Sequence, residues 1–128
     1  MYESPDNASL LRVAWNKQDP NFMATFMMDS HKVLILDVRV PGVPVADLVG
    51  HAAPINSFAW APHSSCHICT AGDDGRALVW DISQMKATMQ EPILEYKADS
   101  EVNYLVWSAA QSDWVSLAYD GKVQALRV

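Results

Sequence analysis

The chain is patterned as short apolar runs that are separated by polar loops and turns. Three of these runs end in a tryptophan, at Trp15, Trp60 and Trp107, so the pattern repeats after 45 and then 47 residues. A period of about 40–45 residues is typical of a four-stranded propeller blade, and long helical repeats overlap that range. The chemistry of the segments between the tryptophans must therefore distinguish strands from helices.

The segments after each tryptophan have the chemistry of β-hairpins. A polar loop and a short apolar run lead to a turn rich in Asp, Ser and Gly, which accept a positive φ or cap their own backbone. A second apolar run follows each turn, and no helical periodicity of comparable length is visible. The turns are Asp29–His31, Asp73–Gly75 and Tyr119–Gly121, and the runs that follow them are Lys32–Leu36, Arg76–Trp80 and Lys122–Leu126. The pattern predicts antiparallel strands.

Two dipeptides of the middle unit identify the repeat. Gly50-His51 opens this unit and Trp80-Asp81 ends its third strand, which is the signature of a WD repeat. We therefore predict an all-β fold: a WD-repeat β-propeller of about three blades of antiparallel four-stranded sheet. The expected repeats cover residues 8–47, 48–97 and 98–128, and the last lacks its outer strand. Because a closed propeller has about four to eight blades, we expect a partial propeller, and we expect the polar segment Ser83–Glu91 to be a long loop.

Composition and charge narrow the class of protein. Half of the 128 residues are hydrophobic and 19% are charged, which excludes a disordered chain. The net charge of −6 and the scattered Lys and Arg residues predict no direct binding to nucleic acid. No apolar run is long enough for a membrane helix, and the residues after Met1 do not resemble a signal peptide. We expect a location in the nucleus and cytoplasm, with no binding to membranes.

The polar residues of the middle unit predict a structural network and not a catalytic site. His51, Thr70, Asp74 and Trp80 occupy the positions where WD blades form a hydrogen-bonded tetrad, and the spacing of six residues to Trp80 favours Asp74 over Asp73. The other two units lack the histidine, so no tetrad is expected in them. Because a nucleophile elbow is also absent, we predict no catalytic residue, no cofactor and no enzyme.

The two cysteines invite a comparison with zinc sites. Cys66 and Cys69 are three residues apart, with His63 and His67 nearby. In a strand, however, residues three apart point to opposite faces, and no second cysteine pair completes a set of four ligands. We expect buried cysteines and no metal site.

The loops at the two ends of the blades are the candidate binding surfaces. One rim carries Asp29, His31, Asp73 and Asp120, and its acidic balance favours basic partner segments. The opposite rim carries Arg39. The repeated tryptophans are expected in the core between blades. Trp114 is either core, the preferred interpretation, or a partner anchor on a rim.

Several segments resemble a known family of WD-repeat scaffolds. They are Leu10–Pro20, Val33–Arg39, Ala59–Cys69 and Leu126–Val128. The family contains the plant regulator Transparent Testa Glabra, its light-regulated relatives and an animal kinase-binding counterpart. The resemblance runs from Tyr2 to Val128, and it implies that the chain corresponds to the C-terminal third of a longer protein.

The resemblance implies a non-catalytic scaffold for protein–protein interactions. Its implied partners are transcription factors of the MYB and basic helix-loop-helix classes, or protein kinases. The alternatives are a substrate adaptor of a cullin-RING ubiquitin ligase and a truncated, non-functional fragment, while a propeller enzyme is not expected. A Trp-Asp-x-Arg motif accompanies the adaptor role in the family. Here Asp37-Val38-Arg39 matches that motif with Leu36 in place of the tryptophan.

Overall fold

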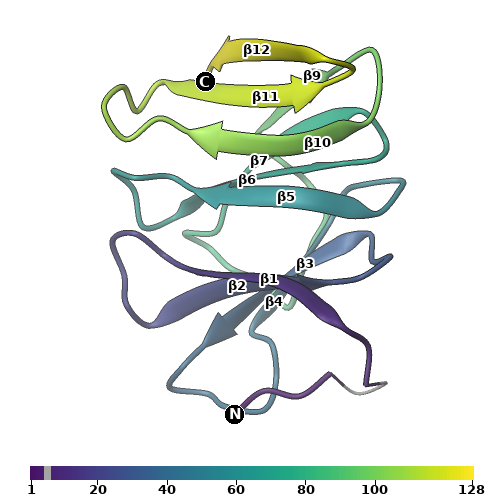
Figure 1. The fold of residues 1–128 in the computed structure, drawn as a ribbon. Coiled ribbons are helices and arrows are strands. Elements are labelled where there is room, and N and C mark those ends of the chain that lie inside the picture. Colours follow the sequence, from purple (N-terminus) through teal and green to yellow (C-terminus); the bar gives the residue numbers. More distant parts are fainter. Residues whose placement is uncertain (5–6) are drawn as a thin grey trace.

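The ordered elements of the chain are β-strands (Figure 1). The structure, a computed structural model, describes residues 1–4 and 7–128. Within these residues no helix is long and apolar enough to cross a membrane. The strands are β1 (Leu10–Trp15), β2 (Phe22–Met27), β3 (Lys32–Asp37), β4 (Ala46–Val49), β5 (Ile55–Trp60), β6 (His67–Gly72), β7 (Arg76–Asp81), β8 (Thr88–Met89), β9 (Leu94–Lys97), β10 (Val102–Trp107), β11 (Trp114–Tyr119) and β12 (Lys122–Arg127). The all-β prediction is confirmed.

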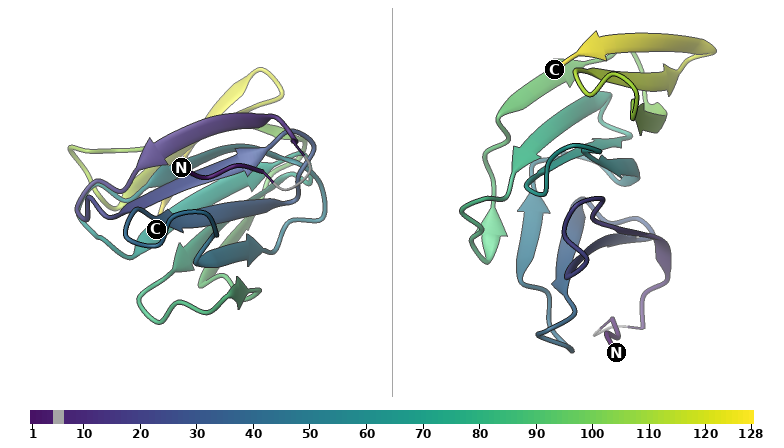
Figure 2. Two further views of the ribbon diagram at one scale, coloured as in Figure 1. Left: turned by 90° about the horizontal axis from the view of Figure 1, so that it is seen from below. Right: turned by 90° about the vertical axis from the view of Figure 1, so that its left-hand side faces the viewer.

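The strands form three sheets that follow one another along an arc (Figure 2). The first sheet has the order β1-β2-β3-β4-β8, the second β5-β6-β7-β9 and the third β10-β11-β12. Consecutive strands within each sheet pair in antiparallel fashion, apart from β4 with β8. We refer to the sheets as blades 1, 2 and 3. This arrangement confirms the partial propeller.

The turns between the second and third strands contain the residues that their backbone requires. Asp29, Gly75, Asp120 and Gly121 all have a positive φ, between 47° and 73°. Tyr119 pairs with Lys122 across Asp120 and Gly121, and a two-residue hairpin with positive φ at both central positions favours this dipeptide. The turns fix the register of the hairpins, which in turn decides which side chains face each neighbouring blade.

The core lies between the blades, in two separate hydrophobic clusters. Side chains of a strand alternate between its two faces. Ile68 and Leu78 of blade 2 accordingly pack toward blade 1, while Cys69 and Val79 pack toward blade 3. Phe26 and Phe58 meet edge to face across the first interface, with ring centroids 5.9 Å apart. Blade 2 is therefore covered on both faces.

The outward faces of blades 1 and 3 are exposed, which corrects one prediction about the tryptophans. Trp60 is 2% exposed and Trp107 is half-buried, but Trp15 is 53% exposed because no blade covers the first sheet on that side. Val33 and Val123 are the second residues of their third strands, yet their exposures are 0% and 79%. The sequence position alone does not decide burial at the ends of the arc.

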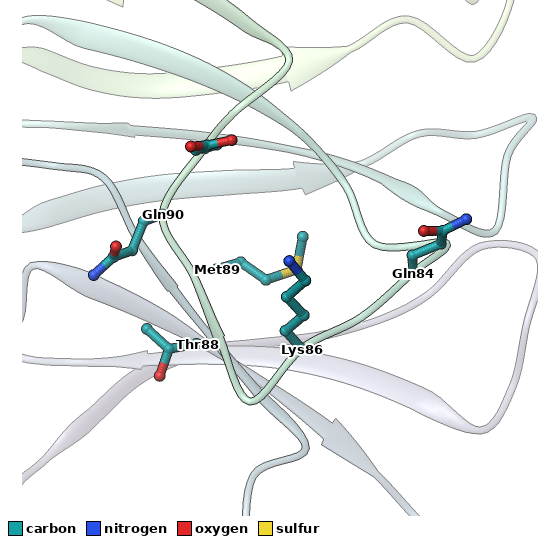
Figure 3. A pocket seen from close by; sticks show the side chains of 6 residues that line it. Gln84, Lys86, Thr88, Met89 and Gln90 are labelled. Carbon is teal, nitrogen blue, oxygen red and sulfur yellow. The ribbon is translucent and has the colours of Figure 1, made fainter.

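The segment that was expected to be a loop crosses to the neighbouring blade. Strand β8 pairs in parallel with β4 of blade 1, and the N–H of Asp47 donates to the carbonyl of Ala87 at 2.9 Å. This pairing covers the outer edge of β4, which would otherwise leave its backbone groups unpaired. The crossing segment encloses a hollow of about 370 Å³ that is lined by Gln84, Lys86, Thr88, Met89, Gln90 and Glu91 (Figure 3).

The blades differ from the expected repeats at one boundary. Strand β4 of blade 1 runs to Val49, so the expected division between residues 47 and 48 falls inside a strand. Blade 3 has three strands in the described chain, and the outer edge of β12 has no pairing strand there. The outer strands β4 and β9 are short, which is why their limits are weakly marked in the sequence.

Candidate functional site

A chain of buried hydrogen bonds joins the loop before β5 to the hairpin of β6 and β7. Nδ1 of His51 lies 3.0 Å from both carboxylate oxygens of Asp74, and its Nε2 lies 2.7 Å from Oγ1 of Thr70. The indole N–H of Trp80 donates to the same hydroxyl at 3.0 Å. The structure thus brings together His51, Thr70, Asp74 and Trp80, and it places Asp73 outside this network.

Burial and hydrogen bonding set the protonation of this network. Burial lowers the pKa of His51, against the opposing effect of the Asp74 carboxylate. Burial alone would raise the pKa of Asp74, but hydrogen bonds from His51 and from the N–H groups of Ala52 and Arg76 lower it. A neutral imidazole has one donor and one acceptor. His51 therefore donates from Nδ1 to the carboxylate and accepts the hydroxyl proton of Thr70 at Nε2.

Gly50 and Arg76 complete the environment of the network. A Cβ atom on Gly50 would lie 2.8 Å from Cη2 of Trp80, so a side chain at this position would collide with the indole. The Arg76 guanidinium donates to Asp74 at 3.0 Å and also to the carbonyl of Gly50. The Gly-His and Trp-Asp dipeptides are thus coupled by direct packing as well as by hydrogen bonds.

Blades 1 and 3 have different residues at the corresponding positions. Counted from the turns, Phe26 and Ser116 take the place of Thr70, and Leu36 and Leu126 take the place of Trp80. Phe26 is fully buried in the apolar cluster between blades 1 and 2. Among the residues that the structure describes, no buried side-chain polar atom lacks a hydrogen-bond partner. The four network residues of blade 2 are bonded to one another, while the Trp60 indole and the Ser57 hydroxyl bond to backbone groups of blades 1 and 3.

The turn rim is acidic and contains a hollow between blades 2 and 3. We use this name for the end of the arc that carries the turns between second and third strands, on the right in Figure 1. Asp29, His31, Asp73 and Asp120 are all exposed there. The hollow measures about 520 Å³ and is lined by Asp73, Asp74, Gly75, Ala98, Asp99, Ser100, Glu101, Asn103 and Asp120. The structure adds Asp99 and Glu101, which lie in the connection between β9 and β10 and were not predicted from the sequence to belong to this surface.

The opposite end of the arc, the loop rim, presents a fixed guanidinium. Arg39 binds Asp37 through two side-chain hydrogen bonds of 2.9 and 2.7 Å, and its backbone N–H donates to the same carboxylate. The hydrogen bonds from Arg39 lower the pKa of Asp37. The guanidinium also lies over the ring of Phe22, 5.7 Å from its centroid, and the side chain is 60% exposed.

Trp114 begins β11 at the loop rim and is 38% exposed. The preferred interpretation of this residue as core is wrong, because the outward side of blade 3 has no neighbouring blade at this point. Its position agrees with the alternative, a rim aromatic.

The two cysteines lie on opposite sides of blade 2. Cys66 packs beside the cluster shared with blade 1, whereas Cys69 lies in the cluster shared with blade 3, where burial raises its pKa to about 12. They do not act as a pair. In the described chain, one group of side chains comes close enough to share an ion, and it combines Cys66 and His67 with Asp81. Asp81 was not predicted from the sequence to join this group, although it pairs with His67 across the hairpin of β6 and β7.

Comparisons with known proteins agree with this geometry. The family described as "WD domain, G-beta repeat" matches residues 42–81. The "DDB1- and CUL4-associated factor 7 homolog" of Dictyostelium discoideum is 52% identical over 128 residues, which are 100% of this chain and 39% of that relative. An uncharacterised WD repeat-containing protein of Schizosaccharomyces pombe is 29% identical and matches 97% of this chain and 38% of its own length.

A solved structure shows the same architecture. The crystal structure of the β-propeller domain of Cps50 (Swd1) from Myceliophteria thermophila matches 94% of this chain and 36% of its own chain, with a TM-score of 0.75 and 18% identity. The chain has the fold of part of a WD-repeat β-propeller.

The family match falls on the part of the WD-repeat propeller that contains the polar network. Residues 42–81 include all four members of the network together with Gly50 and Arg76. The chain spans about two fifths of the length of the two relatives named above, at 39% and 38%. The three blades of this chain thus correspond to about two fifths of the length of those relatives.

The network predicts a pH dependence of stability. The pKa of His51 is lowered in the folded WD-repeat chain, so the unfolded chain takes up a proton first as the pH falls below the ordinary value of 6.5. The free energy of unfolding should therefore decrease between about pH 7 and 5.5, by up to about 1.4 kcal/mol per pH unit. Urea denaturation at several pH values measures this decrease.

Two substitutions isolate the contribution of His51. His51→Gln should lower stability at neutral pH and flatten the decrease, because the titrating group is gone. His63→Gln replaces an exposed histidine and should keep the wild-type slope. An unchanged slope in His51→Gln would show that another group causes the pH dependence.

Proposed function

We propose that this WD-repeat chain works as a scaffold that binds other proteins through its two rims. One observation carries the proposal: His51, Thr70, Asp74 and Trp80 of blade 2 are hydrogen-bonded to one another, while carboxylates and Arg39 are exposed on the rims. A catalytic site needs titratable groups that converge on a substrate. His51 and Asp74 instead connect a loop to a hairpin, which supports the further proposal that the chain is not an enzyme.

The turn rim supports binding of a basic segment. Asp73, Asp99, Glu101 and Asp120 surround its hollow of about 520 Å³, and no Lys or Arg lines it. A cationic side chain that enters this hollow would meet carboxylates from both blade 2 and blade 3. Such charge complementarity contributes to the rate of association and to specificity.

A binding measurement with an arginine-rich peptide tests this proposal. The double variant Asp99→Asn, Glu101→Gln removes two charges from the turn rim, and we expect it to weaken binding about fivefold or more at low salt. The control Asp113→Asn, Glu91→Gln removes the same charge from two exposed residues that do not line the hollow. The control should stay within about twofold of wild type. Equal losses in both variants would show that net charge alone attracts the peptide.

A second candidate function is adaptor activity for a cullin-RING ligase. The name of the Dictyostelium relative associates that protein with DDB1 and CUL4. In this chain Arg39 is held by Asp37 and Phe22 in one exposed orientation. A preordered arginine loses little side-chain entropy on binding, and arginine is enriched among residues that dominate binding energy. These features support a contact between the loop rim and DDB1.

The adaptor proposal predicts a specific loss on removal of this guanidinium. Arg39→Ala should weaken binding of the chain to purified DDB1 by about tenfold or more. Arg12→Ala serves as the control. Arg12 also lies over an aromatic ring, 5.2 Å from the centroid of Tyr104, but the contact joins β1 to β10 and does not involve Asp37 or Phe22. The control should leave the affinity within about twofold of wild type. Surface plasmon resonance measures both, and no binding by the wild-type chain would contradict the adaptor proposal.

The branch of the family, the partner classes and the location of the protein are proposed from the sequence. Membership in the Transparent Testa Glabra branch, and with it binding to MYB or basic helix-loop-helix factors or to kinases, rests on the resemblance of the sequence segments. A location in the nucleus and cytoplasm rests on the sequence in the same way. The acidic turn rim supports partners that expose basic segments, which these classes of protein would have to provide.

A further inference from the structure

Three side chains with metal-binding groups meet at the end of blade 2 that lies away from its hairpin turn. Cys66 directly precedes β6, His67 begins β6, and Asp81 ends β7 as the cross-strand partner of His67. One ligand atom from each residue lies within 4.8 Å of the other two. Thiolate, imidazole and carboxylate are the ligands that zinc takes in proteins. None of the functions proposed above uses this group.

The backbone around the three residues is fixed by hydrogen bonds on both sides. The carbonyl of Cys66 accepts from the N–H of Ile82 at 2.7 Å, and the carbonyl of His67 accepts from the N–H of Ala61 at 3.0 Å. The N–H of Ser83 donates to Oδ1 of Asp81 at 2.8 Å. This bond fixes the carboxyl group, and its Oδ2 is the oxygen on the side of the imidazole.

A hydroxyl group orients the imidazole. Oγ of Ser64 lies 2.7 Å from Nδ1 of His67. Histidine ligands of metals commonly donate their second ring N–H to an oxygen, which fixes the tautomer and the ring plane. With Nδ1–H directed to Ser64, Nε2 of His67 is the free nitrogen, and it is the atom that faces Asp81.

The imidazole of His67 and the carboxylate of Asp81 face each other without a direct hydrogen bond. Nε2 of His67 and Oδ2 of Asp81 are 4.0 Å apart, which is too long for a hydrogen bond. Sγ of Cys66 lies beside the same imidazole, 3.6 Å from Nδ1, the nitrogen that Ser64 also contacts. Ligand atoms of a tetrahedral zinc ion are about 3.4–3.6 Å apart, as zinc–ligand distances of about 2.0–2.3 Å require. The three ligand atoms lie within 4.8 Å of one another, so the most widely separated pair has to approach by up to about 1.4 Å for all three to bind one ion.

His67 is the member of the group that lines a hollow in the loop rim. His63, Ser64 and His67 line this hollow of about 270 Å³ together with apolar side chains of blades 2 and 3, which include Trp107 and Val128. The side chains of His67 and Asp81 are 33% and 36% exposed, so an ion can reach them from solvent.

We propose that Cys66, His67 and Asp81 form a binding site for a divalent ion of the zinc class, with a fourth position open to solvent. Cys66 binds as the thiolate, so each ion that enters displaces the thiol proton to solvent, while His67 binds as the neutral imidazole and Asp81 as the carboxylate. Three protein ligands and one open position are the arrangement in which zinc accepts an outside ligand. Water takes this position in the isolated chain.

Titration with Co²⁺ tests the site, because cobalt reports its ligands by absorption. The wild-type chain should bind one equivalent and show visible bands of tetrahedral cobalt together with a sulfur-to-cobalt charge-transfer band. Zn²⁺ should displace the cobalt and abolish both. Absence of a saturable spectrum at one equivalent would overturn the proposal.

Matched variants distinguish the site from adventitious binding. Cys66→Ser should abolish the charge-transfer band and weaken affinity at least tenfold, and Asp81→Asn should weaken it about tenfold with the band retained. Cys69→Ala removes the other cysteine, and Asp73→Asn removes an exposed carboxylate elsewhere in the blade; both should keep the wild-type spectrum. Ser64→Ala should reduce affinity about tenfold through the orientation of His67.

A measurement of folding keeps these results interpretable. Circular dichroism and the thermal midpoint of each variant without metal show whether it retains the wild-type fold. If Cys66→Ser folds normally and still gives the wild-type cobalt spectrum, the proposed ligand set is wrong. If Cys69→Ala folds normally and loses the charge-transfer band, the thiolate comes from the other cysteine and the proposal is equally overturned.

Discussion

Face-to-face burial between neighbouring sheets is the interaction on which the rest of this molecule depends. Each blade is a thin sheet with apolar side chains on both faces, and a sheet alone cannot remove both faces from water. Blade 2 lies between two neighbours and contributes alternate residues of the same strands to two separate cores. Blades 1 and 3 each have one neighbour, and their other faces expose apolar residues such as Val13 and Val106. An apolar side chain on a sheet face therefore contributes to stability only where a neighbouring blade covers that face.

Buried hydrogen bonds stabilise blade 2 in addition to its packing against both neighbours. His51, Thr70, Asp74 and Trp80 connect a loop to a hairpin within blade 2, in the one blade that is covered on both sides. A buried network of this kind is stabilising only when every member has a partner. Exposed carboxylates gather at the turn rim, and Arg39 is exposed at the loop rim. The division into a paired interior and charged rims is what favours a binding scaffold over an enzyme.

The sequence predicted the parts of the structure that local chemistry determines. Turn residues such as Asp120 and Gly121 marked the hairpins, and the spacing of Gly50-His51 and Trp80-Asp81 placed the network residues together. Contacts between blades were harder to foresee. The pairing of β8 with β4, the exposure of Trp15 and the placement of Glu101 in the turn rim all depend on which neighbour a segment meets in space. Asp81 was missed beside His67 because only spacing along the chain was considered, although the hairpin register brings the two together.

Equivalent valines in blades 1 and 3 offer the most direct test of this account. Val33 and Val123 occupy the same place in their third strands, but Val33 faces blade 2 with 0% exposure and Val123 faces solvent with 79%. Chemical denaturation of the two alanine variants compares their free energies of unfolding. Val33→Ala should lose about 2 kcal/mol through the removed methyl groups and the cavity left behind, while Val123→Ala should change by less than about 0.5 kcal/mol. Equal losses at the two positions would contradict the claim that contact between neighbouring blades stabilises the chain.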